Sequence, residues 1–395
     1  MRRRRLGIPA MGVVGPLGIG KLETSRRLFE GSRSGLVLRE GLVPERPVYV
    51  GAVESNLPAV PPRHATRNNQ LMLAALDEIR ADVEETAVRF GRERVAVILG
   101  TSTSGVELGE RAFAFHRANG AWPAGFDYRQ QELGALAAFA AEMLDLRGPA
   151  YTIATACSSS AKVFATARRL IETGLCDAAI VGGADSLCGT TLNGFATLEA
   201  LSRGRSNPFS KNRDGINIGE AAAAFLVTRE EAPIGLLGVG ESSDAHHMSA
   251  PDPSGRGALA SMQAALDGAG LAAGDLSYIN LHGTGTPLND SMEGIAVATL
   301  FGADIPCSST KGMTGHTLGA AGACEAAFLW LTLHPDFTSG GLPPHVWDGV
   351  QDPSIPAIRL VDSRIAVPRD RPVAMMSNSF AFGGSNVSLI LDRSV

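Results

Sequence analysis

Apolar residues along the chain fall into two alternating patterns, short unbroken runs and longer segments in which an apolar residue recurs at helical spacing. Short runs rich in Val, Ile and Ala are typical of buried strands, and recurrence every three or four residues is typical of an amphipathic helix. The runs predict strands within residues 6–20 and at 95–99, 151–156, 177–183, 221–227 and 277–281, with two closing strands that flank 378–385. The spaced segments predict helices at 71–90, 131–145, 158–171, 257–269, 290–301 and 319–333, and a loop-and-helix insertion at 110–130.

Strands and helices alternate on both sides of an acidic, proline-containing segment at residues 229–233. Alternation of this kind predicts an α/β fold. We therefore expect two halves, residues 1–231 and 232–395. Both have the same alternation of strands and helices, although no tandem repeat is visible in their sequences. Pro9 is unfavourable in a central strand because it has no N–H group to donate.

The composition argues against several classes of protein. The chain has 395 residues, is 45% hydrophobic and contains 46 glycines, which suits a compact enzyme with many tight turns. A formal net charge of −5 gives no sign of a nucleic-acid partner. The basic residues 1–5 are not followed by the apolar segment of a signal peptide, and no run is long enough to span a membrane. Five cysteines without a Cys-x-x-Cys pair make disulfides and metal sites unexpected, so we expect a cytoplasmic protein without a bound metal.

Cys157 lies where the predicted strand 151–156 meets the predicted helix 158–171. Ser158 and the serines that follow it are suited to cap this helix. The positive end of the helix dipole would then lie beside the thiol, which would lower its pKa and favour the reactive thiolate. The alternative is a buried structural cysteine, and this stretch alone does not decide between the two.

Two motifs in the C-terminal half place polar residues after an apolar strand. His282 begins a Gly-Thr turn, and Asp290 is placed to cap the next helix with Glu293 as its capping-box partner. Lys311 and His316 lie in a Gly-rich loop that enters a helix of small residues. Taken singly, these residues have ordinary explanations, a turn cap for the histidine and a surface charge for the lysine.

A last motif, Phe380-Ala-Phe-Gly-Gly, contains two glycines that allow a tight turn with exposed backbone N–H groups, and alone it would predict only a hairpin. Together, the motifs supply a thiol, two imidazoles and an ammonium group. This set suits thioester chemistry, in which a thiolate takes an acyl group and N–H groups stabilise an oxyanion.

The motifs resemble those of the β-ketoacyl-acyl carrier protein synthases, the condensing enzymes of the thiolase superfamily, and match their elongating Cys-His-His class. The matching stretches are Thr155-Ala-Cys-Ser-Ser-Ser, His282-Gly-Thr-Gly-Thr, Thr310-Lys-Gly-Met-Thr-Gly-His and Phe382-Gly-Gly-Ser-Asn. Weaker similarity at residues 12–18 and 213–215 extends the match to nearly the whole chain. The resemblance implies a duplicated, five-layered αβαβα thiolase fold, usually dimeric, with acyltransferase activity.

The resemblance also implies roles for the motif residues. Cys157 would be the nucleophile, and its N–H group and that of Phe382 would form the oxyanion hole. Phe382 would also gate the site, next to Gly383. His282 and His316 would bind a malonyl thioester and stabilise the enolate formed by decarboxylation.

Further residues follow from the same resemblance. Lys311 would organise His316 and an acid, which falls on Glu325. Thr284 and Thr286 would bind the phosphopantetheine arm of an acyl carrier protein, so that no separate cofactor is expected.

The chain departs from the family pattern at several places. Ala381 stands where the family usually has Gly, which predicts a stiffer gating loop, and Asn289 replaces a common Gly before Asp290. Cys157-Ser-Ser-Ser is more typical of polyketide-type synthases than of fatty-acid ones. The loop at residues 241–255 resembles that of aryl-polyene-type synthases, which favours polyene over fatty-acid elongation.

Other candidates have open alternatives. His247 is expected either to line the pantetheine tunnel or to be an ordinary loop histidine. A basic rim, either a docking surface for an acidic carrier protein or a solvated surface, comprises Arg63, Arg67, Arg203, Arg205, Lys211 and Arg213. Aromatic residues between positions 113 and 126 are expected in the core, at a dimer contact or along the acyl pocket.

Three functions remain to be compared. The first is an active elongating synthase, a homodimer or a heterodimer. The second is a degradative thiolase, which would carry a second cysteine near the last Gly-Gly turn, where this chain has Phe382. The third is a chain-length-factor-like partner without activity of its own, which usually lacks the cysteine that this chain has at position 157.

Overall fold

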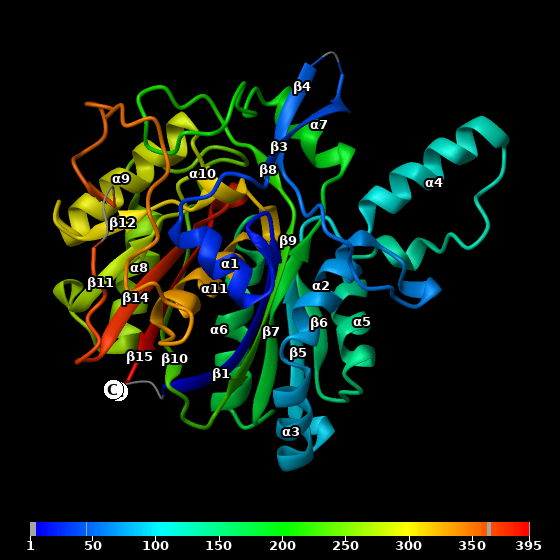
Figure 1. Cartoon of the computed structure of the whole chain (residues 1–395), viewed down its shortest axis with the longest axis horizontal. Coiled ribbons are helices and arrows are strands. Elements are labelled where there is room, and N and C mark those ends of the chain that lie inside the picture. Colours follow the sequence, from blue (N-terminus) through cyan, green and yellow to red (C-terminus); the bar gives the residue numbers. More distant parts are fainter. Residues whose placement is uncertain (1–4, 45, 362–364, 395) are drawn as a thin grey trace.

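The computed structural model describes residues 5–44, 46–361 and 365–394 (Figure 1). The strands form one large mixed sheet and one small sheet. The strands are β1 (Leu6–Gly15), β2 (Gly18–Ile19), β3 (Leu36–Val43), β4 (Arg46–Gly51), β5 (Val95–Gly100), β6 (Ala150–Ile153), β7 (Ala178–Asp185), β8 (Ile218–Gly219), β9 (Ala221–Thr228), β10 (Ile234–Ser243), β11 (Leu276–Asn280), β12 (Pro306–Ser308), β13 (Arg359–Leu360), β14 (Val373–Phe380) and β15 (Ser385–Arg393). The α-helices are α1 (Lys21–Phe29), α2 (Arg67–Asp77), α3 (Arg80–Phe90), α4 (Val106–Asn119), α5 (Ala135–Met143), α6 (Ser159–Glu172), α7 (Gly189–Thr197), α8 (Arg256–Ala269), α9 (Pro287–Phe301), α10 (Lys311–Thr314) and α11 (Ala321–Leu333).

The large sheet consists of two halves with the same topology. In the N-terminal half the strand order is β1-β9-β7-β5-β6, and in the C-terminal half it is β10-β15-β14-β11-β12, with the short β13 added in parallel beyond β12. In both halves the first strand pairs antiparallel with the last, and the three strands farthest from the centre run parallel. The duplication predicted from the family resemblance is therefore present in the strand order. The segment at 229–233 lies between β9 and β10, which suits a division of the chain there.

Five layers result from the way the helices cover this sheet. Figure 1 shows α6 and α11 between the two halves, α2 and α5 outside the N-terminal half, and α8 and α9 outside the C-terminal half. Three apolar cores fill the spaces, one around α6 and α11 and one beneath each outer layer. The small sheet, β3-β4-β8, packs with α7 in a fourth cluster. No helix within the described ranges has the length and apolar character that crossing a membrane requires.

One predicted helix differs from the structure. The pattern at 71–90 is divided between α2 and α3, with a break at Glu78 and Ile79. The Glu78 carboxylate accepts hydrogen bonds from the backbone N–H groups of Val13 (2.8 Å) and Lys21 (3.0 Å). Because these contacts tie residue 78 to β1 and α1, tertiary structure overrides the local periodicity.

Two predicted strands have a different environment from the one expected. Pro9 lies within β1, where its side chain is exposed and the pairing with β9 shifts register between Gly7 and Ala10, so the missing N–H group breaks no regular ladder. β6 is not buried but forms an edge of the sheet, paired with β5. Tyr151 on this edge is 39% exposed.

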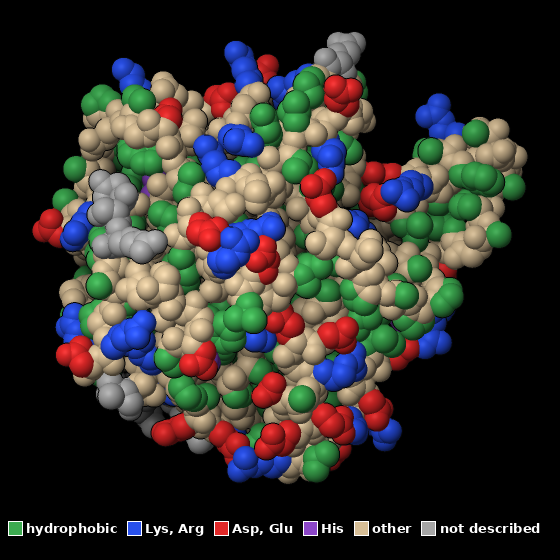
Figure 2. Space-filling view, in the orientation of Figure 1, with side chains coloured by type: hydrophobic (Ala, Val, Ile, Leu, Met, Phe, Trp, Pro, Cys, Tyr) green, Lys and Arg blue, Asp and Glu red, His purple; other side chains and the backbone are tan. Residues whose placement is uncertain are grey.

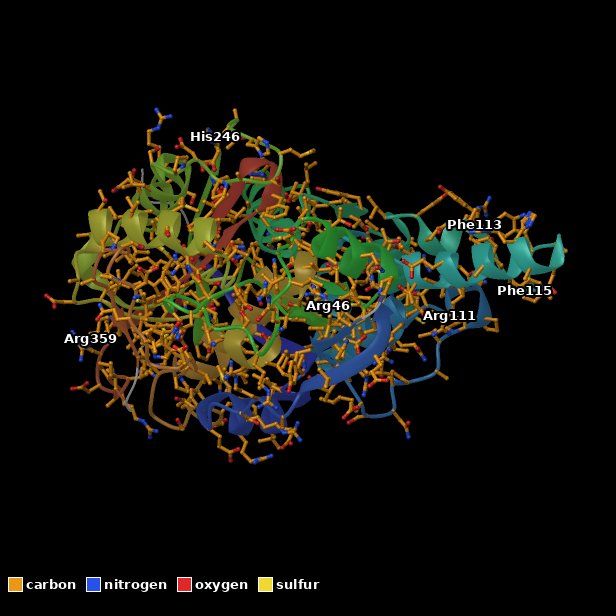
Figure 3. All side chains as sticks on the ribbon, turned by 90° about the horizontal axis from the view of Figure 1, so that it is seen from above. Arg46, Arg111, Phe113, Phe115, His246 and Arg359 are labelled. Carbon is orange, nitrogen blue, oxygen red and sulfur yellow. The ribbon has the colours of Figure 1, made fainter. Side chains whose placement is uncertain are left out.

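The insertion predicted near 110–130 projects from the body of the molecule. We call α4 and the loop that follows it, residues 106–134, the aromatic arm. It extends to one side in Figures 1 and 3, and hydrophobic side chains gather along it in Figure 2. Its exposed large apolar side chains are Phe113, Phe115, Trp122, Tyr128 and Leu133.

Candidate active site

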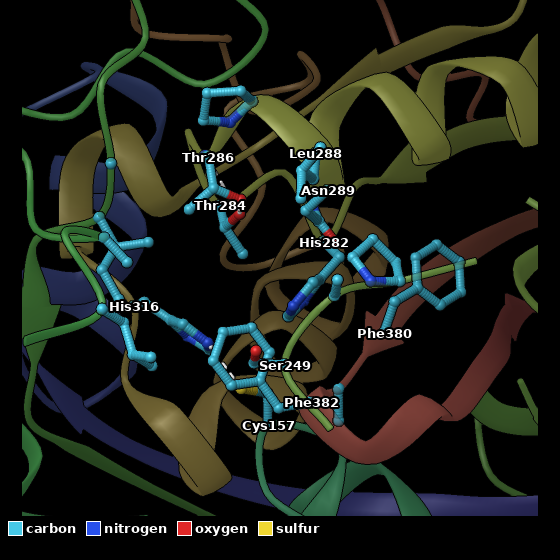
Figure 4. Close-up of a pocket in the computed structure, with 18 of the residues that line it drawn as sticks. Cys157, Ser249, His282, Thr284, Thr286, Leu288, Asn289, His316, Phe380 and Phe382 are labelled. Carbon is cyan, nitrogen blue, oxygen red and sulfur yellow. Dashed lines mark hydrogen bonds between the residues drawn. The ribbon is translucent and has the colours of Figure 1, made fainter. Parts of the chain in front are cut away.

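Most of the predicted site residues line one cavity of about 280 Å³ (Figure 4), namely Cys157, His282, Thr284, Thr286, His316 and Phe382. The lining does not include Lys311, Glu325, Gly383 or His247. Cys157 follows β6, His282 follows β11, His316 follows β12 and α10, and Phe382 follows β14. Within each half the strands that carry these residues lie in a parallel set, so their carboxyl ends are close together, and the carboxyl ends of the two sets meet at the cavity. The fold therefore brings reactive side chains from both halves together at the carboxyl ends of the strands.

Cys157 lies on a tight corner between β6 and α6. Ala156 has a left-handed backbone (φ 51°), which is uncommon for a residue with a Cβ atom. The serines predicted as helix caps do not cap α6. Instead, Ser159 Oγ accepts the N–H of Thr155 (2.9 Å) and Ser158 Oγ donates to the Thr155 carbonyl (2.9 Å), so both hydroxyls brace the corner.

The thiol of Cys157 differs from the expectation. Burial raises its pKa to about 11, and the nearby Lys311 charge lowers it only in part. The predicted lowering at a helix N-terminus is wrong because desolvation of the thiolate exceeds the favourable charge interactions. The backbone N–H groups of Cys157 and Phe382 both interact with the sulfur. His316 Nε2 lies 2.9 Å from Sγ, where it can exchange a proton with the thiol.

The two histidines face the sulfur from the C-terminal half. Their rings are 5.3 Å apart and nearly perpendicular, and both side chains are buried. Burial, reinforced by the positive charge of Lys311, holds the pKa of His282 and of His316 well below the usual range, so both imidazoles are neutral at pH 7. The Cys157 sulfur and one nitrogen of each ring lie within 4.8 Å of one another, so one small acyl group can contact all three.

Lys311 organises a different histidine from the one expected. Its Nζ donates to the His282 carbonyl (2.5 Å), lies 3.3 Å from His282 Nδ1 and forms an ion pair with Glu325. His316 Nδ1 has no hydrogen-bond partner among the described residues. The expected pairing of Lys311 with Glu325 is present, whereas the expected contact with His316 is wrong. Burial raises the pKa of the Glu325 carboxyl to about 7.

Asp290 and Glu293 do not form the predicted capping box. Helix α9 begins at Pro287 after Thr286, one turn earlier than expected, so both acids lie within it. The Glu293 carboxylate accepts the N–H groups of His282 (2.8 Å) and Gly283 (2.7 Å). The sequence pattern missed Glu293 as a residue that fixes the histidine turn, since an acid inside a helix is indistinguishable from a surface charge before the fold is known.

The outer part of the cavity contains Thr284 and Thr286, whose hydroxyls are 2.9 Å apart. His247 does not line it. Its ring is exposed, and Nδ1 accepts the N–H groups of Ser249 (3.1 Å) and Ala250 (3.2 Å), which line the cavity in its place. His247 is thus an ordinary loop histidine whose hydrogen bonds fix the backbone of Ser249 and Ala250 beside the cavity.

Phe382 covers the cavity above Cys157 (Figure 4) and packs against the ring of Phe195, with 5.6 Å between centroids. Gly383 has φ 80°, which favours glycine, and its N–H donates to the Met248 carbonyl (2.8 Å). The loop that carries Phe382 is thereby tied to the loop at 241–255.

Half of the predicted basic rim is already paired. Arg67 forms an ion pair with the buried Glu220, Arg63 pairs with Glu142, and Arg213 is largely buried against Asp352. The members without an ion pair to another described residue are Arg203, Arg205 and Lys211, all exposed and in the loop that precedes the cavity residues Asp214 and Gly215.

Comparison with known proteins agrees with this geometry. Residues 4–232 match the N-terminal domain of the beta-ketoacyl synthases, and residues 235–344 match their C-terminal domain. A 3-oxoacyl-[acyl-carrier-protein] synthase 2 from Coxiella burnetii is 31% identical over the whole chain and 99% of its own length. The synthase of the same name from Rhizobium meliloti is 39% identical over 63% of this chain, and that match spans less than two thirds (62%) of the relative's own length.

A solved structure is also similar. The ketosynthase ApeO from Xenorhabdus doucetiae, in complex with its chain length factor ApeC, superposes with a TM-score of 0.93 and 47% identity, covering 99% of this chain and 98% of that one. Domain matches, whole-length identity and superposition agree, and the chain belongs to the β-ketoacyl synthase family, with its thiolase fold.

Proposed function

We propose that the chain is a β-ketoacyl-[acyl carrier protein] synthase that joins an acyl thioester to malonyl-acyl carrier protein with loss of CO₂. The observation that carries this proposal is the 2.9 Å approach of His316 Nε2 to Cys157 Sγ, with His282 beside both. The similarity to 3-oxoacyl-[acyl-carrier-protein] synthases supports the same substrates.

Acyl transfer is the first half of the proposed reaction. Cys157 gives its proton to His316 Nε2, and the thiolate attacks the acyl carbonyl of the carrier thioester. The backbone N–H groups of Cys157 and Phe382 stabilise the tetrahedral oxyanion, because they already interact with the sulfur from which that carbon will extend. The carrier thiol leaves with the proton.

Condensation is the second half. The ammonium group of Lys311 lies beside His282 Nδ1, so Nδ1 accepts and the ring proton resides on Nε2. Nε2–H can then donate to the malonyl thioester carbonyl and stabilise the enolate that forms as CO₂ leaves. The enolate carbon attacks the thioester on Cys157, the carbon–sulfur bond breaks, and the departing thiolate takes up a proton that comes from water by way of His316 Nε2.

His282→Ala is expected to leave acylation of Cys157 largely intact and to lower decarboxylation of malonyl-carrier protein by about 10²–10³-fold, the usual cost of one oxyanion donor. His316→Ala is expected to lower both steps, because it also removes the base next to the thiol. Acyl-adduct mass and CO₂ release measure the two steps separately. The matched control is His246→Ala, an exposed histidine outside the cavity. Equal loss of both steps in His282→Ala would contradict the division of roles.

The proposed partners follow from the surface. The acidic carrier protein docks on Arg203, Arg205 and Lys211, and its phosphopantetheine arm, rather than a separate cofactor or a metal, brings the substrate past Thr284 and Thr286. The free cysteines suit a reducing compartment, and we propose the cytoplasm. The resemblance of residues 241–255 to aryl-polyene-type synthases supports elongation of a polyene chain.

We also propose a second chain of the same fold against the β6 edge and the aromatic arm. An unpaired edge strand and an exposed aromatic cluster are unusual on a monomer. In one relative with 47% identity the partner is a chain length factor. The runner-up, that this chain is itself such a factor, is disfavoured because Cys157 and both histidines are present and in contact.

Replacing two aromatic-arm residues, in Phe113→Ser/Trp122→Ser, is expected to reduce the assembly to a monomer, because it removes the exposed rings that would be buried. Arg111→Ser, on the same helix and exposed, is the matched control. Light scattering on the chain alone and with a co-expressed chain length factor gives the mass. An active homodimer would remove the need for a factor, and an aromatic-arm variant that still dimerises would place the interface elsewhere.

A further inference from the structure

Asp185, the last residue of β7, is fully buried and lies outside the cavity of the active site. Its Oδ1 accepts hydrogen bonds from the Thr101 hydroxyl (2.7 Å), the Ser102 N–H (2.8 Å) and both the N–H (2.8 Å) and hydroxyl (2.7 Å) of Thr103. Its Oδ2 accepts the N–H of Ala320 (3.1 Å). The carboxylate thus joins a loop of the N-terminal half to a loop of the C-terminal half.

The first loop supports the nucleophile. Ser102 Oγ donates to the carbonyl of Ala156 (3.2 Å), the residue with φ 51° that precedes Cys157. A left-handed alanine persists only where its surroundings hold it in place. Asp185 accepts a hydrogen bond from the backbone N–H of Ser102 and so holds Ser102 in place. Through Ser102 it stabilises the turn that carries Cys157.

The second loop follows His316. Leu318, two residues later, also has a left-handed backbone (φ 53°), and Ala320 ends the short 3₁₀ turn Leu318–Ala320 that leads into α11. Gly319 packs so closely that a Cβ atom there would lie 2.7 Å from Asp185 Oδ2 and 2.6 Å from Ser102 Oγ. The loop therefore rests directly on the carboxylate.

The geometry points to Asp185 as a positioning residue that sets the distance between Cys157 Sγ and His316 Nε2. It touches neither group and acts through Ser102–Ala156 on one side and Ala320 on the other. The inference deepens the proposed function, because it concerns the same sulfur-imidazole pair.

If Asp185 had a purely structural role, a neutral side chain would fill it at a lower desolvation free energy. The hydrogen-bond partners of Asp185 given above are hydroxyl and N–H groups, and burial raises the pKa of its carboxyl. A buried carboxylate is costly to desolvate. An acid that accepts five hydrogen bonds can, however, bind two loops at one point, which no neutral side chain of this size does.

Asp185→Asn separates the two links. With its single carbonyl oxygen in the Oδ1 position, asparagine keeps the bonds to residues 101–103 but turns an NH₂ group toward the N–H of Ala320. The contact to the His316 loop becomes repulsive while the N-terminal contacts remain. Gly319→Ala displaces the same loop by its added Cβ atom and leaves the charge of Asp185 unchanged.

The readout is alkylation of Cys157 by iodoacetamide as a function of pH, which needs neither substrate nor carrier protein. For Asp185→Asn, a purely electrostatic effect and a positioning effect predict opposite changes in the alkylation rate of Cys157. The Asp185 charge raises the pKa of the Cys157 thiol, so its removal alone would speed alkylation. Loss of the 2.9 Å approach to His316 would instead slow it, by about tenfold or more near pH 7.5, with rates converging near pH 11, where the thiolate forms without a base.

We expect slower alkylation near neutral pH in both Asp185→Asn and Gly319→Ala, and a matching loss of acyl transfer. The matched control is Asp177→Asn, just before the other end of β7, whose carboxylate pairs with Arg94 and Arg229 away from the site. It is expected to lower the melting temperature without changing the pH profile. Faster alkylation in Asp185→Asn, or an unchanged profile in a folded Gly319→Ala, overturns the inference. Since alkylation requires no acyl substrate, a chain that alkylates normally yet fails to condense would contradict the proposed function instead.

Discussion

Cys157→Ala is expected to abolish the acyl adduct and to lower condensation by at least about 10³-fold, because among the described residues Cys157 provides the only thiol in the cavity lining. Intact-protein mass after incubation with an acyl-carrier protein measures the adduct directly. Addition of malonyl-carrier protein should then remove the adduct from the wild type and release CO₂.

A matched control is provided by Cys176→Ala. Cys176 is also buried, and burial raises the pKa of its thiol to about 11 as well, but no histidine among the described residues hydrogen-bonds to it. This variant should acylate like the wild type. If it lost the adduct while Cys157→Ala kept it, reactivity would follow something other than the imidazole contact, and the assignment of the nucleophile would be wrong.

Lys311→Met is expected to destabilise the fold by about 3–5 kcal/mol at a pH well above 7, where Glu325, whose pKa burial raises to about 7 even beside Lys311, would be an ionised carboxylate buried without its cation. It should also abolish condensation, since the ammonium group that orients His282 through Nδ1 and the backbone carbonyl is lost. Denaturant unfolding and CO₂ release measure the two effects.

The double variant Lys311→Met/Glu325→Gln separates stability from catalysis. Removing both charges should recover most of the lost stability, whereas activity should stay low because His282 still lacks its partner. A double variant that regained activity would show that Lys311 serves only to neutralise Glu325. A stable Lys311→Met single variant would mean that Glu325 is protonated in the folded protein.

The sequence predicted most elements because their apolar patterns are long and regular, as in α8, β9 and α11. It failed where distant contacts decide local structure. The break between α2 and α3 depends on N–H groups of β1 and α1 that reach Glu78, and the exposure of β6 depends on its place in the strand order.

The candidate site was predicted through its motifs, and Cys157, both histidines, both threonines and Phe382 line one cavity. The electrostatic details were not predictable, because they depend on burial. Burial of the Cys157 thiol raises its pKa, whereas the sequence predicted that the pKa would be lowered. The conformation of the loop at 241–255 leaves His247 outside the cavity. Asp185 carries no recognisable motif, since its partners come together only after both halves have folded.

The matching strand order of the halves has one further consequence. Cys157 lies between β6 and α6, and His316 lies between β12 and α11, so the two occupy corresponding positions of the repeat. In two identical subunits related by a twofold axis, corresponding positions carry the same residue, so a contact between those two positions joins like side chains. When both halves belong to a single polypeptide, each half can mutate independently. An imidazole in one half can then contact a thiol at the corresponding position of the other half. The proposed acid-base pair is therefore a product of broken symmetry, which a dimer of separate, identical halves could not achieve.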